Sequence, residues 1–213
     1  MLTVALSGGR ISQHFFAAVV EGARRGKISF ASVHFFWADE RCVPPDDAES
    51  NFRVARELLL APLKIADDRI HRIRGEASPD FAAAEAEAEI CRIAPLTDHG
   101  QPVLDLVFLG MGEDGHVASL FPGEPESVMT SPAVYRAVTA TKPPPRRITL
   151  GYAAIAAARQ VWVLASGAGK EVALRDSLDP AGQTPLARVI KARLRTRILT
   201  DVQNRSTRSE TSA

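Results

Sequence analysis

Residues 104–116 read LDLVFLGMGEDGH, an apolar run that ends in a glycine-rich turn with an aspartate and a histidine. The run at 104–109 predicts a buried strand, because strands in a sheet covered on both faces are apolar along their length. The glycines let a ligand approach the backbone and its N–H groups. Asp114 and His116 flank Gly115, so a base neighbours a carboxylate. Active sites of α/β folds form at such strand ends.

The alternation of short apolar runs with stretches of helical period extends along most of the chain. Further strands are predicted at residues 3–6, 32–37, 134–138, 147–150 and 161–165. Helices are predicted at residues 12–25, 51–60, 79–93, 153–158 and 170–178. This pattern predicts an α/β fold, a doubly wound and mostly parallel sheet with helices on both faces.

Length and charge limit the organisation and the partners. The 213 residues indicate a single α/β domain over residues 1–202, followed by a polar tail at 203–213 that we expect to be disordered. A formal net charge of +1 provides no global field for nucleic acid or for an anionic membrane surface. Any anion that the protein binds must therefore be met by local charges.

The cysteines and the beginning of the sequence suggest the compartment. Cys42 and Cys91 are the two cysteines and form no CxxC pair, which is typical of a reducing cytoplasm. The apolar stretch at residues 2–6 is too short for the core of a signal peptide, and no apolar run reaches membrane-spanning length. We expect a cytoplasmic protein that is neither secreted nor inserted in a membrane.

A second group of charged residues follows the predicted strand at 32–37. Residues 35–44 read FFWADERCVP, which places Asp39 and Arg41 at a strand end. A guanidinium beside a glycine loop can hold a phosphate or carboxylate with two parallel hydrogen bonds. Ser50, directly before the predicted helix at 51–60, is explained by helix N-capping alone.

Two further strand ends carry glycine turns. Ser7, Gly8 and Gly9 follow the first predicted strand and precede a helix, an arrangement that turns backbone N–H groups toward an anion. Residues 166–170, SGAGK, follow the strand at 161–165. Lys170 falls in the first turn of a predicted helix, where a cation is disfavoured, so a bound anion explains it better than helix stability does.

Other readings of these motifs are weaker. The glycines of residues 110–115 match GxGxxG, yet Pro122 and Pro125 interrupt the helix that a dinucleotide site requires, and no acidic residue stands about 20 positions further on. The sequence contains no GxSxG, HExxH or Walker A motif. The remaining histidines lack catalytic surroundings and are predicted to be structural or exposed: His14, His34, His71 and His99.

Taken in order, LSGG, WADERCVPPDDAESN, LGMGEDGHVASLFPG, RRITL and SGAGK resemble the 6-phosphogluconolactonase family and span residues 6–170. The resemblance implies the Rossmann-like fold that these lactonases share with glucosamine-6-phosphate isomerases and deaminases. The deaminases carry a catalytic glutamate five residues beyond the histidine. Phe121 occupies that position here, which favours the lactonase.

The activity implied by this resemblance is the hydrolysis of 6-phospho-D-glucono-1,5-lactone to 6-phospho-D-gluconate in the oxidative pentose phosphate pathway, without a metal or an organic cofactor. His116 is the expected base, since an imidazole titrates near ~6.5 and can take a proton from water. Asp114 is expected to orient the imidazole. Arg41 or the N–H groups of the glycine loop would stabilise the oxyanion.

The resemblance also implies a set of substrate- and phosphate-binding residues. The binding residues are Ser7, Gly8, Gly9, Asp39, Arg41, Asn51, Gly112, Arg147 and Lys170. The partner is a small phosphosugar lactone, with no nucleic acid and no membrane. We expect a monomer or a weak homodimer.

The chain departs from the family pattern at a few positions. The phosphate loop of the family reads SGGST before a proline, whereas Arg10 and Ile11 follow Gly9 here, and Val117 replaces a threonine. A leading segment of about 25 to 30 residues is expected to be missing. Two other functions stay open: a phosphosugar sensor without catalysis, and a metal-dependent hydrolase that uses His116 with Asp39 and Asp114.

Overall fold

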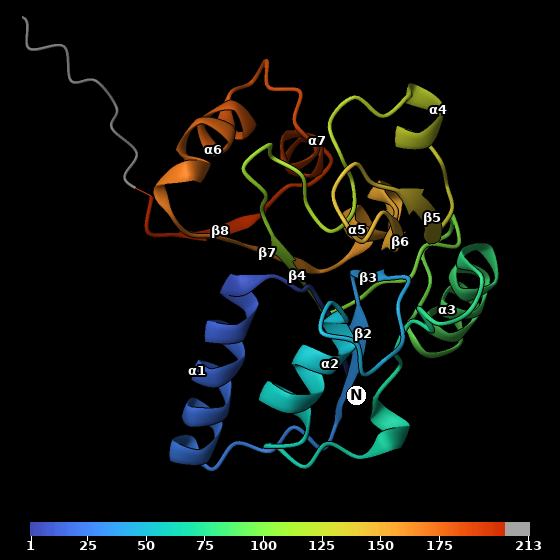
Figure 1. Cartoon of the computed structure of the whole chain (residues 1–213), viewed down its shortest axis with the longest axis vertical. Helices are drawn as coiled ribbons and strands as arrows, with labels where there is room; N and C mark the ends of the chain where they lie inside the picture. Colours follow the sequence, from blue (N-terminus) through green and yellow to red (C-terminus); the bar gives the residue numbers. More distant parts are fainter. Residues whose placement is uncertain (203–213) are drawn as a thin grey trace, which may run out of the picture.

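The structure, a computed structural model that describes residues 1–202, is built around a parallel five-stranded sheet (Figure 1). Its order is β2-β1-β4-β7-β8, and every neighbouring pair is parallel. The strands are β1 (Leu2–Leu6), β2 (Val33–Trp37), β4 (Leu106–Gly110), β7 (Gln160–Ala165) and β8 (Arg197–Thr200). The predicted tail at 203–213 lies outside the described residues.

A second sheet of three antiparallel strands was not predicted. It has the order β3-β6-β5, with β3 (Asp39–Arg41), β5 (Tyr135–Thr139) and β6 (Arg146–Leu150). The strands expected at 134–138 and 147–150 therefore exist but lie outside the parallel sheet. The connection from β5 to β6 is short, and two strands joined in this way pair antiparallel, because a parallel return requires a crossover of a dozen or more residues.

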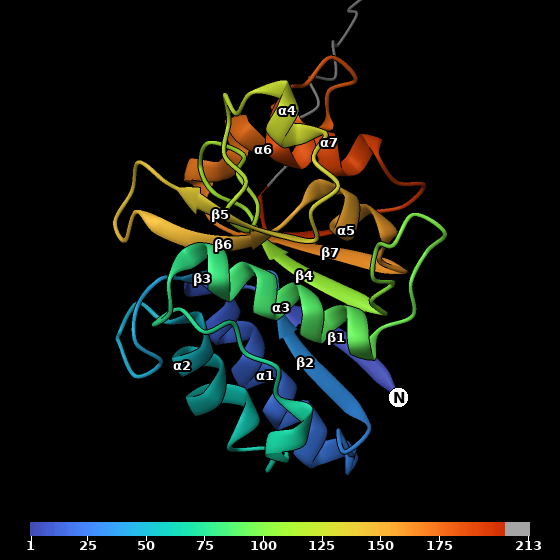
Figure 2. The same cartoon turned by 90° about the vertical axis from the view of Figure 1, so that its right-hand side faces the viewer.

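Helices cover both faces of the parallel sheet, which confirms the predicted fold class. Figure 2 shows α1 and α2 on one side of it and α5, α6 and α7 on the other, and α3 packs on β5 and β6. The helices are α1 (Arg10–Gly26), α2 (Asn51–Ala55), α3 (Pro79–Ile93), α4 (Glu126–Met129), α5 (Tyr152–Ala157), α6 (Glu171–Leu178) and α7 (Pro185–Lys191). A π-helical turn, Arg56–Leu60, continues α2. No helix within residues 1–202 has both the length and the apolar character needed to cross a membrane.

Amphipathic spacing explains how α1 packs. Its buried residues are Ser12, Phe16, Val20 and Ala23, three or four positions apart, so they form one stripe that faces the sheet. Phe16 is 2% exposed and belongs to the core, together with Trp37 and Leu109 from the strands. This packing fixes the first residue of α1 beside the carboxyl end of β1.

The two sheets are joined at the end of β2. The backbone N–H of Ala38 donates to the carbonyl of Leu6 at 2.7 Å, and the Ala38 carbonyl accepts from the N–H of Leu150 at 2.7 Å. The hydroxyl of Tyr135, a fully buried side chain on β5, donates to the Trp37 carbonyl at 2.6 Å. Burial raises the pKa of this phenol, so Tyr135 stays protonated and keeps donating.

Replacing Tyr135 with phenylalanine should weaken this joint. The Tyr135→Phe variant leaves the buried Trp37 carbonyl without its hydroxyl donor, which should lower the free energy of unfolding by about 1–3 kcal/mol. Urea unfolding followed by fluorescence measures the loss. A variant as stable as the wild type would show that this hydrogen bond does not hold the sheets together.

Two of the histidines form a partly buried hydrogen-bonded chain beside β2, an edge strand of the parallel sheet. Arg69 Nη1 donates to His34 Nε2 at 2.5 Å, His34 Nδ1 lies 2.8 Å from His71 Nε2, and His71 Nδ1 lies 2.8 Å from Glu89 Oε1. Because arginine only donates, every proton in the chain has an acceptor when both imidazoles are neutral. Burial lowers the pKa of both histidines, so the predicted structural role is confirmed for this pair.

The histidine pair should make stability depend on pH. In the unfolded chain the imidazoles take up protons near pH 6.5, whereas in the folded chain they do so only at lower pH. The stabilisation is therefore complete above about pH 6.5 and is lost as the pH falls. Urea unfolding at pH 7.5 and pH 5 should show a smaller loss for His34→Gln than for wild type. The exposed His99→Gln variant is the control, and equal losses in all three proteins would contradict the assignment.

Candidate active site

The carboxyl ends of β1, β4 and β7 and the two end residues of β3 surround a cleft of about 390 Å³. Ten of the predicted site residues line it: Ser7, Gly8, Gly9, Asp39, Arg41, Asn51, Gly112, His116, Arg147 and Lys170. Parallel strands bring their carboxyl ends to one edge of the sheet, which explains why segments far apart in the sequence meet there. Asp114 does not line the cleft but contacts His116.

The turn after β4 closes tightly and presents His116. The N–H of Gly112 donates to the His116 carbonyl at 2.9 Å, and the N–H of Gly115 donates to the Gly112 carbonyl at 3.1 Å. Gly115 has a φ of +78°, a conformation that favours glycine. At Gly112 a Cβ would overlap both the His116 ring and the Asp114 carboxylate, so the turn requires glycine there.

Asp114 orients the imidazole. Its Oδ1 accepts hydrogen bonds from the His116 backbone N–H at 3.3 Å and from ring atom Nδ1 of the same residue. Burial opposes ionisation of Asp114, but the bond to His116 and the nearby Lys142 ammonium outweigh it and lower the pKa of the carboxyl. A carboxylate on Nδ1 places the proton there and leaves Nε2 as the basic nitrogen.

One side of the imidazole is covered by Phe121. The centroids of the His116 and Phe121 rings are 5.0 Å apart. The Arg147 guanidinium lies over the Phe121 ring, 5.6 Å from its centroid. The position of the deaminase glutamate therefore lies next to the histidine, and here it holds an apolar ring. Phe121 contributes packing and no proton.

The turn after β1 provides buried polar groups. Gly9 has a φ of +94° and caps α1, and the Ser12 hydroxyl donates to the Gly8 carbonyl at 2.8 Å. The Ser7 hydroxyl is buried and has no hydrogen-bond partner within the part of the chain that the structure describes. Such an orphaned group at a cleft is explained by a ligand.

Lys170 lines the cleft near the start of α1. It ends a 3-10 turn, Ala168–Lys170, and caps α6, so the prediction that it lies in the first turn of that helix is wrong by one residue. Burial and the nearby Arg10 lower the pKa of the Lys170 ammonium. Asp201, at the end of β8, holds the turn by accepting from the Ser166 hydroxyl at 2.7 Å and the Gly167 N–H at 3.0 Å.

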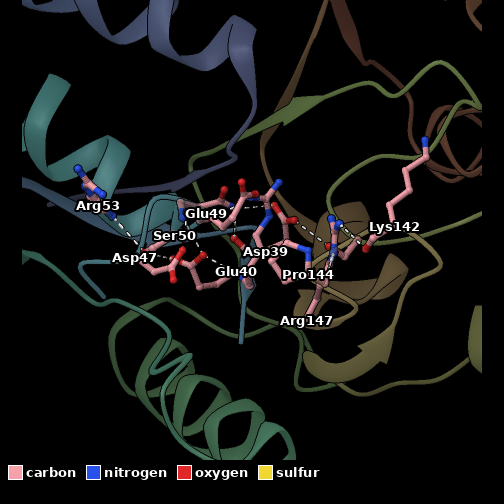
Figure 3. Close-up of polar contacts among 12 residues, drawn as sticks. Asp39, Glu40, Asp47, Glu49, Ser50, Arg53, Lys142, Pro144 and Arg147 are labelled. Atoms are coloured by element: carbon pink, nitrogen blue, oxygen red, sulfur yellow. Dashed lines mark hydrogen bonds and ion pairs between the residues drawn. The ribbon is translucent and has the colours of Figure 1, made fainter. Parts of the chain in front are cut away.

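Two arginines line the other side of the cleft. Arg147 is 6% exposed and donates from Nε to the Pro144 carbonyl at 3.1 Å and from Nη2 to the Lys142 carbonyl at 3.3 Å (Figure 3). Burial, followed by the charge of Arg41, lowers the pKa of its guanidinium. Arg41 donates from Nη1 to the Glu49 carbonyl at 2.7 Å, while its Nε is buried without a partner among residues 1–202.

The side chains of Asp39 and Asn51 also line the cleft. Asn51 Nδ2 donates to the Asp39 carbonyl at 2.9 Å, and Asp39 Oδ2 accepts from the Ser119 hydroxyl at 2.8 Å. A Cβ at Gly8 would overlap the Asn51 amide, so this side chain packs directly on the glycine turn. Ser50 caps α2 through its hydroxyl, as predicted.

Sequence reasoning missed several residues of this site. Ser119 and Asp201 act through contacts with distant segments and left no local signal. His14 is exposed, as one of the predicted alternatives states, but it also lines the cleft. Its spacing of four residues from Arg10 on α1 places both on one helix face and could have revealed it.

A metal-dependent hydrolase would require a group of metal ligands at the cleft. Among residues 1–202, no three or more His, Cys, Asp or Glu side chains form a group that could hold a metal ion. His116, Asp39 and Asp114 therefore do not make up such a group. Asp39 is bound to Ser119 and Asn51, and Asp114 to His116.

Fold and cleft together define a doubly wound α/β protein with an acid–base pair beside glycine turns and cations. The sequence matches the family model described as glucosamine-6-phosphate isomerases/6-phosphogluconolactonase over residues 1–198. The chain belongs to this family, as the motifs predicted.

Individual relatives agree with the family. A 6-phosphogluconolactonase of Treponema pallidum is 38% identical, over 87% of this chain and 76% of the relative. One of Streptomyces coelicolor is 36% identical, over 85% of this chain and 72% of the relative. The solved 6-phosphogluconolactonase of Trypanosoma brucei superposes with a TM-score of 0.78 at 30% identity, covering 93% of this chain and 83% of that one. A monomeric glucosamine-6-phosphate deaminase, 19% identical with a TM-score of 0.78 and covering 93% and 85%, shares the fold.

Substitution of Gly112 tests the geometry of the turn. In Gly112→Ala the added Cβ overlaps the His116 ring, so the imidazole must move and turnover should fall by about 100-fold or more. Gly22→Ala, in α1, is the control and should keep full activity, because beyond its own stretch of helix the added Cβ would have no atom of residues 1–202 within 4 Å. Steady-state kinetics and circular dichroism measure activity and folding. A fully active Gly112→Ala protein would mean that the ring position is not constrained by this turn.

Proposed function

We propose that this protein is a 6-phosphogluconolactonase, which hydrolyses 6-phospho-D-glucono-1,5-lactone to 6-phospho-D-gluconate in the oxidative pentose phosphate pathway. The observation that carries the proposal is the His116 imidazole, oriented through Nδ1 by Asp114 and lining a cleft with glycine turns and cations. The names of the related proteins support the same activity. Lactone hydrolysis requires a base, an oxyanion site and an anion site, and the cleft offers each.

The proposed reaction begins with water held near His116. Nε2 takes a proton from the water as its oxygen attacks the C1 carbonyl carbon of the lactone, which gives a tetrahedral oxyanion. N–H groups of the glycine turn or the Arg41 guanidinium stabilise that charge. Collapse then breaks the bond between C1 and the ring oxygen, and the imidazolium returns its proton to the departing oxygen. The side chains end in their starting protonation states.

The 6-phosphate is proposed to bind on the opposite side of the cleft from His116. The turn at Ser7, Gly8 and Gly9 offers N–H groups at the N-terminus of α1 and a hydroxyl that has no hydrogen-bond partner among residues 1–202. Lys170 and Arg10 contribute positive charge there. Arg147 and Arg41 supply two further cations on the wall formed by the second sheet.

The deaminase reaction of the same family is disfavoured by the side chain next to His116. Opening a sugar ring requires an acid–base group at the position that Phe121 occupies, and this phenylalanine has no proton to exchange. Hydrolysis of a lactone proceeds with the single base. The local chemistry therefore favours the lactonase.

The proposal includes the setting in which the enzyme works. We place it in the cytoplasm as a monomer or weak homodimer that uses neither metal nor organic cofactor and binds neither nucleic acid nor membrane. The free thiols of Cys42 and Cys91 support a reducing compartment.

Activity of wild type and His116→Ala tests the proposal. We expect the wild type to form 6-phosphogluconate from fresh lactone in the presence of EDTA, at a rate well above spontaneous hydrolysis. His116→Ala should lose about 100-fold or more of this excess, because the base is removed. Coupling to 6-phosphogluconate dehydrogenase measures the product. The exposed His99→Ala variant is the matched control.

Other outcomes of this experiment would support one of the two alternative functions or remove His116 from the mechanism. Excess activity that disappears with EDTA would point to the metal-dependent hydrolase. Calorimetric binding of 6-phosphogluconate without any turnover would point to a phosphosugar sensor. Equal activity of wild type and His116→Ala would remove the histidine from the mechanism.

A further inference from the structure

Glu40 is a buried carboxylate that the proposed mechanism does not use. It is 2% exposed and lies between Asp39 and Arg41 in β3. Successive side chains of a strand point to opposite faces, and the two neighbours of Glu40 line the cleft. The Glu40 side chain therefore points away from the cleft, toward the start of α2.

Four donors surround this carboxylate. Oε1 accepts from the backbone N–H groups of Arg41 at 2.7 Å and Asn51 at 2.8 Å, and Oε2 accepts from the Phe52 N–H at 2.7 Å and the Ser50 hydroxyl at 3.2 Å. Figure 3 shows Glu40 beside Ser50 at the centre of this network. Burial raises the pKa of Glu40 to about 7, and the three backbone N–H groups act in the opposite direction.

These contacts dock the first turn of α2 on the strand. The N–H groups of Asn51 and Phe52 are the first two of the helix, which have no partner within a helix. The Ser50 hydroxyl caps α2 by accepting from the Arg53 N–H at 3.2 Å and at the same time donates to Glu40. The Glu40 carboxylate thus accepts hydrogen bonds from the first two N–H groups of α2 and from the hydroxyl of the capping serine.

Docking of the first turn of α2 on β3 sets the position of Asn51, which lines the cleft. Asn51, the first residue of α2, donates to the Asp39 carbonyl at 2.9 Å and packs its amide on Gly8 of the glycine turn. The contacts of Glu40 with the Asn51 and Arg41 backbones fix two cleft side chains from behind. A shift of α2 would move Asn51 and open the wall beside the glycine turn.

We propose that Glu40 is a positioning residue for substrate binding, which acts by holding Asn51 and Arg41 against the cleft. The inference rests on the proposed function for its substrate. It assigns no contact between Glu40 and the substrate. It leaves the position of the His116 base unchanged, because that base is held by the turn after β4 and not by α2.

The test compares Glu40→Gln with a matched control. A glutamine keeps the shape but turns an NH₂ group toward N–H donors, which should displace the turn and raise KM about tenfold while kcat stays within about threefold. Glu87 on α3 also accepts two backbone N–H groups, from Val134 and Tyr135 at 3.0 and 3.1 Å, away from the cleft. Glu87→Gln should change KM by less than about twofold even where stability falls.

Two outcomes of this comparison would overturn the proposal. In one, Glu40→Gln unfolds more easily but keeps the wild-type KM, which makes the carboxylate merely structural. In the other, both variants raise KM equally, which shows a general loosening of the protein. Urea unfolding of each variant is measured beside the kinetics.

A milder variant keeps the test decisive if Glu40→Gln does not fold. Ser50→Ala removes one of the four donors and should raise KM by about twofold to fivefold. An unchanged KM in Ser50→Ala would then contradict the proposal. In the double variant Glu40→Gln/Asn51→Ala, or Ser50→Ala/Asn51→Ala, the rise in KM should be smaller than the product of the single effects. Multiplicative effects would mean that Glu40 does not act through Asn51.

Binding measurements separate this inference from the proposed function. Calorimetric titration with 6-phosphogluconate, and separately with inorganic phosphate, reports on the cleft without turnover. If wild type binds 6-phosphogluconate but hydrolyses no lactone, the proposed function fails, and a weaker affinity of Glu40→Gln but not of Glu87→Gln still supports the positioning role. Equal affinities of wild type and Glu40→Gln overturn it.

Discussion

The backbone of Ala38 is hydrogen bonded to both sheets, and the shape of the cleft depends on this residue. Its N–H donates to Leu6, the last residue of β1, and its carbonyl accepts from Leu150 at the end of β6. The chain leaves the parallel sheet at Trp37 and enters the antiparallel sheet at Asp39. The glycine turn after β1 is therefore fixed opposite the charged residues of β3, so one wall of the cleft comes from each sheet.

Charge is distributed unevenly in this nearly neutral chain. Burial lowers the pKa of Arg147 and of Lys170, which means that the protein holds both cations where they lack full hydration. The charges of Asp39 and Glu49 near Arg147, and of Glu113 and Asp201 near Lys170, oppose this lowering but do not outweigh burial. In the proposed complex, the anionic substrate adds negative charge beside these two cations, so binding energy would arise locally without a basic surface.

Local sequence signals predicted those parts of the molecule that form from neighbouring residues. The apolar run before Gly110 identified β4, and the glycines after it identified the turn that presents His116. The Ser50 cap was also readable from the sequence. The strand β3 was not, because its three residues, Asp39 to Arg41, are all charged and are recruited by β6. Strand β8 is an exposed edge with little apolar pattern, and α7, with Thr184 as its cap and Pro185 as its first residue, carried a start signal that was overlooked.

Residues that support the cleft without lining it were the hardest to predict. Asp39, Arg41 and Asn51 were predicted from the family resemblance, with a side-chain argument for Arg41 alone. The cleft brings the three together, and their roles toward the substrate stay predictions. Glu40 was passed over because a glutamate between two functional residues resembles part of a solvated loop. Its importance follows from contacts with residues ten to twelve positions further on, which exist only when α2 folds back on β3.

Arg10 shows how the proposed phosphate-binding edge differs from the family motif. The motif offers hydroxyl groups after the two glycines, whereas this chain places a guanidinium on the first residue of α1, close enough to Lys170 to lower the pKa of that ammonium. Two cations that repel each other at a helix N-terminus raise the energy of the protein without an anion, and a phosphate between them removes the repulsion. In the proposed phosphate complex, the substitution replaces directional hydrogen bonds with charge, so binding at this edge should be more sensitive to salt than binding through hydroxyl donors.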